Sequence, residues 1–188
     1  MKKKITIGGI GSVLLGDDGV GPYVVRLLEA NYEFGEGITV SDLGTPGLDL
    51  VAHLSGQDAL ILIDSVDNGA SPGTVTLYRR ADILKHGPSP VRMDPHSPAL
   101  SESLLIAELA GQNPDEVLLV GITGHRYEVG TSLSHAARRA ATQALAETLA
   151  EVARLGGHYR KRSNPQDSST WWEATEANDS TALLLTNS

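Results

Sequence analysis

The sequence predicts a three-layer α/β/α fold, with helices on both faces of a mostly parallel, twisted, five-stranded sheet. Continuous apolar runs are typical of strands that are covered on both faces. Four such runs occur, at residues 5–10, 38–43, 59–65 and 117–122. Segments with helical spacing of apolar residues alternate with them, at residues 19–31, 46–55, 99–111 and 131–155. This alternation indicates a parallel sheet, in which ligands bind beyond the carboxyl ends of the strands.

The fifth strand is predicted at residues 73–78, where apolar and polar residues alternate and β-branched residues are frequent. We expect this strand to lie at an edge of the sheet, antiparallel to its neighbour. The last predicted helix carries a long apolar stripe that includes Leu133, Ala137, Ala144 and Leu149. Such a stripe predicts that the helix packs along the sheet.

Length and composition limit the class of protein. The chain has 188 residues, 40% of them apolar, which is enough for one domain with a hydrophobic core. Its net charge of −8 argues against nucleic acid or an anionic membrane as a partner. The absence of Cys excludes disulfides, thiolate metal sites and cysteine nucleophiles. No stretch approaches the roughly 20 apolar residues of a membrane span. We expect the protein to be cytoplasmic and monomeric.

The character of the chain changes after the last predicted helix. Gly156 and Gly157 end that helix, so we expect a folded domain over residues 1–156 and a polar tail over residues 157–188. The polar run has too little apolar surface to offset the entropy of ordering it, which predicts disorder. The alternative is a docking segment built on Trp171, Trp172 and the leucines at 183–185.

The most informative motif is GIGSVLLGDDGVG at residues 9–21, which joins the first strand to the first helix. Glycines allow sharp turns and close approach to a ligand. A phosphate-binding loop would be neutral or basic, whereas this loop carries two adjacent acids, Asp17 and Asp18. The motif therefore indicates a site for a metal ion or for proton transfer.

Two more side chains follow other strands and could reach the same edge of the sheet. Asp64 ends the strand at 59–65, and His96 lies in the long loop before the helix at 99–111. Together with Asp18 they provide two carboxylates and one imidazole, a donor set that suits a divalent first-row metal. His125 follows the strand at 117–122 and competes with His96 for the imidazole role.

Each of these residues also has an explanation that involves no site. Asp18 could cap the helix that begins at Gly19. Asp64 could form an Asx turn, and His96 could be a surface histidine in a proline-rich loop. Spacing alone does not decide between these explanations and a shared site.

With these residues assembled, the chain resembles the hydrogenase maturation endopeptidases, the family that trims the large subunit of nickel–iron hydrogenases. The resemblance covers about residues 4–155 and rests on motifs in matching order. These motifs are the glycine-rich segment at 9–21, DLGTPG at 42–47, LILIDS at 60–65, PGT at 72–74, Pro95-His96, VGI at 120–122 and GTSLS at 130–134. Ser12 stands where the family usually has Asn, and TGHRYE at 123–128 lacks the proline often found after VGI.

The resemblance implies a protease that removes the C-terminal extension of a hydrogenase large-subunit precursor already loaded with nickel and iron. The family's nickel ligands fall on Asp18, Asp64 and His96, and the nickel is the substrate's own ion, bound transiently. A nickel ion held in this way could polarise the scissile carbonyl or lower the pKa of a bound water.

The resemblance also implies which residues act on the substrate. Asp18 and Asp64 are the expected catalytic residues, with support from Asp17, and Asp17 or Asp64 could act as general base. Whether hydrolysis is aspartic or metal-assisted stays open. Gly44 and Thr45 are expected to contact the substrate. His125 is also expected to contact it, and, because it lies in the segment that departs from the family pattern, His125 and Arg126 are expected to alter substrate selectivity.

Two other classes of protein share part of this pattern. A receiver-like phospho-acceptor module also has an acid pair after the first strand and an Asp ending the third. However, the acids here lie deep in a glycine loop, and no Lys follows the strand at 117–122 to contact a phosphoryl group. A dinucleotide-binding loop would need a third glycine where Leu14 stands.

Overall fold

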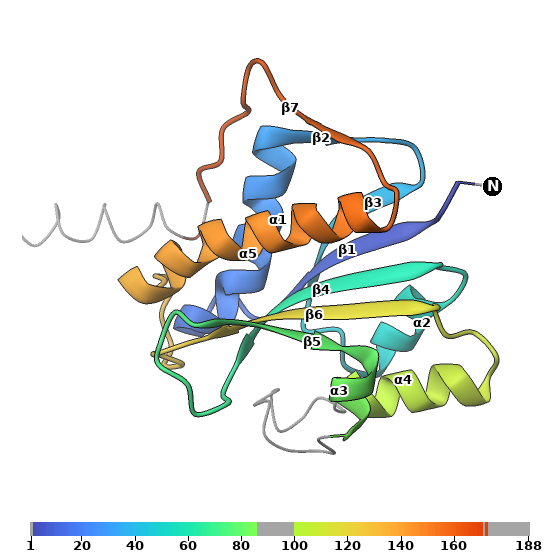
Figure 1. Ribbon diagram of the computed structural model, residues 1–188. Helices are drawn as coiled ribbons and strands as arrows, with labels where there is room; N and C mark the ends of the chain where they lie inside the picture. Colours follow the sequence, from blue (N-terminus) through green and yellow to red (C-terminus); the bar gives the residue numbers. More distant parts are fainter. Residues whose placement is uncertain (1, 86–99, 171, 173–188) are drawn as a thin grey trace, which may run out of the picture.

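Five strands form a twisted sheet in the order β3-β1-β4-β6-β5 in the computed structural model, which describes residues 2–85, 100–170 and 172 (Figure 1). Their bounds are β1 (Ile5–Ile10), β3 (Ile38–Gly44), β4 (Ala59–Val66), β5 (Val75–Arg79) and β6 (Glu116–Thr123). β1 pairs in parallel with β3 and β4, and β4 with β6. β5 is antiparallel to β6 at the edge. The predicted fold class is thus confirmed.

Alternate residues of β4 explain why both faces of the sheet are covered. Ile61 and Ile63 belong to one core cluster, whereas Leu60 and Leu62 belong to the other, and all four are at most 1% exposed. Burial of each such side chain contributes about 1.5–3 kcal/mol. A strand with two apolar faces is stable only between two helical layers.

The two helical layers lie on opposite sides of the sheet (Figure 1). One layer consists of α1 (Val20–Asn31) and α5 (His135–Arg154), which pack on the first cluster. The other contains α2 (Leu50–Leu54), the short α3 (Arg80–Lys85) and α4 (Leu100–Leu109). None of the helices in the described residues combines the length and apolar character that a bilayer crossing requires.

Helix boundaries differ from the sequence expectation where turns and caps intervene. The helix expected at 46–55 is a short 3-10 turn, Gly47–Asp49, followed by α2. The last helix starts at His135, because the Ser134 side chain caps it by accepting a hydrogen bond from Ala137 N at 3.2 Å.

Residues 157–170 do not form the tail expected from the sequence. β7 (Tyr159–Lys161) pairs antiparallel with β2 (Tyr32–Phe34), next to the end of α1 (Figure 1). Arg162 N donates to Asn31 O at 2.8 Å, and the Arg160 guanidinium donates to the Glu33 carboxylate at 2.6 Å. Backbone pairing and ion pairs order this polar segment. The sequence predicted disorder because the segment has little apolar surface, and these contacts do not depend on apolar surface.

The end of this segment is also in contact with the fold. Arg26 donates to Asp167 O at 2.6 Å, and Trp172 is only 7% exposed. This burial agrees with the docking alternative for Trp172. Trp171 and residues 173–188 lie outside the described residues, so the expectation of disorder there stays a prediction.

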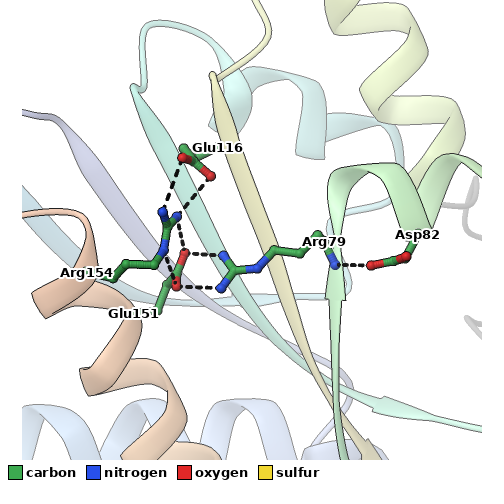
Figure 2. A network of polar contacts seen from close by, with 5 residues as sticks. All are labelled: Arg79, Asp82, Glu116, Glu151 and Arg154. Atoms are coloured by element: carbon green, nitrogen blue, oxygen red, sulfur yellow. Dashed lines mark hydrogen bonds and ion pairs between the residues drawn. The ribbon is translucent and has the colours of Figure 1, made fainter.

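A network of charged residues joins α5 to the amino end of β6 and to β5, as Figure 2 shows. Glu151 is 5% exposed and accepts hydrogen bonds from the guanidinium groups of both Arg79 and Arg154. Arg154 also donates to Glu116 at 2.9 Å. Burial alone would raise the pKa of Glu151, but the hydrogen bonds from Arg154 and Arg79 outweigh it and lower the pKa to about 2.

Glu151→Gln should therefore lower the free energy of unfolding at neutral pH, by about 2 kcal/mol. Because the folded-state pKa lies below the unfolded value of 4.5, the stabilisation by Glu151 is complete above pH 4.5 and is lost as the pH falls towards 2. Urea unfolding of the wild type and of Glu151→Gln between pH 7 and pH 3 measures whether their free energies of unfolding converge as the pH falls. Glu29→Gln, at an exposed position, is the control, and a difference for Glu151→Gln that does not vary with pH would contradict the assignment.

Truncation tests the role of residues 157–172. A chain ending at Gly156 loses the β2–β7 pairing and the burial of Trp172, so its free energy of unfolding should fall by about 2–4 kcal/mol. A chain ending at Trp172 is the matched control and should melt like the full-length protein. Equal melting temperatures for the two truncated chains would show that β7 contributes nothing to the fold.

Candidate functional site

The glycine-rich loop brings the start of α1 against the ends of two central strands. A Cβ atom on Gly21 would lie 2.3 Å from Ile10 O and 2.4 Å from Ile63 O, so only glycine fits there. Gly11 has φ +129°, and a Cβ on it would lie 1.8 Å from Asp18 O. These close approaches place Asp17 and Asp18 at the carboxyl end of the sheet, where the sequence predicted the site.

Asp17 is fully buried and holds the glycine-rich loop against the loop between β6 and α5. Its Oδ2 accepts hydrogen bonds from the backbone N–H of His125 at 2.7 Å, the backbone N–H of Arg126 at 3.2 Å and the Ser134 hydroxyl at 2.8 Å. Its Oδ1 accepts from Ser134 N at 2.6 Å. Burial alone would raise the pKa of Asp17, but these hydrogen bonds together outweigh it and lower the pKa.

These contacts give Asp17 a structural role. Its side chain is 0% exposed and both oxygens are occupied by donors, so it cannot accept a proton from a water molecule or reach a substrate. Asp17 therefore supports the site by holding the backbone in place and not by transferring a proton. Asp17 fixes the loop that carries Asp18.

Asp18 is half-buried and does not cap the helix. The N-terminal caps of the 3-10 turn at Gly16–Gly19 and of α1 have no side-chain hydrogen bond. Instead, Asp18 Oδ2 accepts from Ser12 N at 2.7 Å, and Oδ1 accepts from the Ser65 hydroxyl at 3.0 Å. The helix-cap explanation is wrong, because the carboxylate is turned towards β4 and not towards the N-terminus of α1.

Asp64 lies in β4 and is 5% exposed. Its Oδ1 accepts from Ser65 N at 2.7 Å. Burial, and next the negative charge of Asp18, raise the pKa of Asp64 well above its ordinary value. The two acids thus lie close enough to interact, and the arrangement can hold a proton or receive a cation.

Ser65 is a contributor to the site that the candidate set from the sequence did not include. It contacts Asp18 through its hydroxyl and Asp64 through its backbone N–H. Tyr127 lies over the same region, with its hydroxyl donating to Val66 O at 3.4 Å, and burial raises its pKa. In the sequence, Ser65 directly follows Asp64 at the end of a predicted strand, and this position was the signal that could have identified it.

Of the two predicted histidines, one lies outside the described residues and the other lines a cavity at the start of α5. His96 lies outside the described residues, so its expected place beside the two acids stays a prediction. Within residues 2–85 and 100–170, no group of three potential metal-ligating side chains occurs. The backbone N–H of His125 binds Asp17, while its side chain lines a separate cavity at the start of α5. It does not complete the acid pair.

Of the predicted substrate-contacting residues, Gly44 ends β3, which lies next to β1, and Thr45 follows it. Gly44 O accepts from Gly11 N at 2.8 Å, which fixes the start of the glycine-rich loop. Thr45 is exposed. Both residues therefore lie at the same carboxyl edge of the sheet as the acid pair.

Comparison with known proteins shows which family this chain resembles. A family model described as hydrogenase maturation protease matches residues 22–151, a range that includes Asp64 and begins just after the glycine-rich loop. The hydrogenase expression/formation protein HupM of Azotobacter chroococcum is 37% identical over 153 residues, covering 81% of this chain and 73% of the relative. The hydrogenase 2 maturation protease of Escherichia coli is 27% identical, covering 81% of this chain and 93% of the relative.

Comparison with solved structures identifies proteins of the same family. The solved structure of the hydrogenase maturating endopeptidase HybD from Escherichia coli superimposes with a TM-score of 0.79 at 27% identity, covering 85% of this chain and 98% of that one. None of these matches is a receiver-like module or a dinucleotide-binding protein. The matched family model spans well over half of the sequence, and the chain therefore belongs to the hydrogenase maturation protease family.

Proposed function

We propose that this protein removes the C-terminal extension of a nickel-loaded hydrogenase large-subunit precursor. The observation that carries the proposal is the pair formed by Asp18 and Asp64 at the carboxyl edge of the sheet, in a member of this family. The relatives named above support hydrogenase maturation as the context. The cytoplasmic location and the monomeric state expected from the sequence stay predictions.

In this proposal the nickel ion enters as part of the substrate. Asp18 and Asp64 offer carboxylate oxygens to it, and His96 is the proposed third ligand. Without a cation, the negative charge of Asp18 opposes ionisation of Asp64. A divalent ion removes this repulsion, so the acid pair favours a precursor that carries its metal over one that does not.

Hydrolysis requires a group that accepts a proton from the attacking water. Of the acids in the glycine-rich loop, Asp17 is excluded by its four hydrogen bonds, whereas Asp18 is half-buried. We assign this role to the Asp18–Asp64 pair. The Ser65 hydroxyl orients Asp18 through its 3.0 Å hydrogen bond.

Substitutions in the adjacent acids should separate catalysis from folding. In Asp18→Asn the amide oxygen can still accept from Ser12 N, and the amide N–H₂ can donate to the Ser65 hydroxyl. We therefore expect a nearly unchanged melting temperature and a loss of precursor processing of about 100-fold or more. Asp17→Asn turns an amide N–H₂ towards backbone donors, which should lower the free energy of unfolding by about 2–4 kcal/mol. A gel assay of precursor cleavage and thermal unfolding by circular dichroism measure both, and the reverse pattern would refute the division of roles.

Asp64→Asn should abolish processing without harming the fold. The amide keeps the hydrogen bond from Ser65 N and removes a buried carboxyl group whose pKa is raised in the folded state. For such a group the folded state is favoured below the unfolded pKa of 3.8, and this contribution is lost as the pH rises through the folded pKa. The variant should therefore match the wild type near pH 3.8 and be more stable at higher pH.

Chemical denaturation over this pH range measures the predicted gain in stability. Asp49→Asn, an exposed acid at the start of α2, is the matched control and should leave both stability and processing unchanged. A stable Asp64→Asn protein that still cleaves the precursor at the wild-type rate would overturn the assignment of Asp64.

A further inference from the structure

A cavity of about 780 Å³ lies at the start of α5, and three arginines and two histidines are among the residues that line it. Arg126 and His125 contribute from the loop after β6, and His135, Arg138 and Arg139 contribute from the first turns of α5. Among the described residues that line the cavity, none is acidic. This concentration of positive charge is notable in a chain whose net charge is −8.

Two of the guanidinium groups are held in place by neighbours. Arg138 lies over the ring of Tyr23, 5.8 Å from its centroid. Arg126 donates to Ser132 O at 3.3 Å. Positioned guanidinium groups bind carboxylates well, because their planar donors can form two parallel hydrogen bonds with one carboxylate.

The positive charge of the cavity does not depend on the backbone of the helix N-terminus. Asp17 accepts from Ser134 N, His125 N and Arg126 N, and the Ser134 hydroxyl accepts from Ala137 N. The buried Asp17 carboxylate compensates the helix dipole there. An anion in the cavity would therefore be bound by the side chains. The three arginines that line the cavity carry more positive charge than the single Asp17 carboxylate neutralises.

The cavity shares its framework with the acid pair. Asp17 N donates to Arg126 O at 2.8 Å, and Gly16 N donates to Gly130 O at 2.8 Å. The loop that carries Arg126 is thus bonded directly to the loop that carries Asp18. A substrate chain bound at the acid pair could extend along this loop towards the cavity.

We infer that the cavity binds the terminal carboxylate of the precursor's C-terminal extension. This inference rests on the proposed function, because a protease that removes a C-terminal extension always meets a substrate with a free α-carboxylate. The arginine-lined cavity beside the site offers the complementary charge. Binding there positions the extension for cleavage and takes no part in the chemical step.

The double variant Arg126→Glu/Arg139→Glu tests this inference. It changes only side chains, so the backbone contacts of residue 126 with Asp17 remain. With the nickel-loaded precursor, we expect KM to rise about tenfold or more while kcat changes less than about twofold and the melting temperature is unchanged. Lys3→Glu/Lys161→Glu, at exposed positions away from the cavity, makes the same change in net charge and should leave KM unchanged.

A second measurement isolates the carboxylate itself. Two synthetic peptides with the sequence of the precursor's extension, one with a free C-terminus and one amidated, are titrated calorimetrically into the protein. The wild type should bind the amidated peptide about tenfold more weakly, and the double variant should bind both peptides alike. Equal affinity of the wild type for both peptides would overturn the inference.

The two proposals fail in different ways. If the wild type does not cleave the precursor at all, the proposed function fails. If the wild type cleaves the precursor but the double variant has an unchanged KM, only the cavity's role is overturned.

Discussion

The buried carboxylate of Asp17 is the interaction on which the carboxyl edge of this protein depends. An unpaired buried charge would be strongly destabilising, but the four hydrogen bonds that Asp17 accepts offset its desolvation. These donors come from the loop after β6 and from the N-terminus of α5. One side chain therefore fixes the relative positions of two segments that are far apart in the sequence, the glycine-rich loop and the connection between β6 and α5.

This constraint separates the roles of two adjacent and chemically identical residues. Asp17 points into the protein, and Asp18 points towards Ser65 and the end of β4. Because the backbone around Asp17 is held on both sides, Asp18 is presented to Asp64 in one orientation. The site is in this sense preorganised by a residue that takes no part in the proposed reaction.

The opposite end of the molecule is held by a different set of charges. Glu151 binds two arginines and ties the last turns of α5 to β5, and Arg154 extends the contact to the start of β6 (Figure 2). The pairing of β7 with β2 adds a further attachment beside α1. The last helix is therefore fixed at both of its ends, by Asp17 and Ser134 at one and by Glu151 at the other.

The sequence by itself determined the sheet, the helical layers and the candidate acids. Apolar runs such as residues 59–65 have a local signature, because a strand covered on both faces must be apolar throughout. The division of labour between Asp17 and Asp18, the contribution of Ser65 and the cationic cavity were decided only by the tertiary structure. These features depend on which loops meet at the edge of the sheet, and no local pattern encodes that. The same holds for β7, whose three residues are too few for a periodic pattern and which is ordered only by pairing with β2.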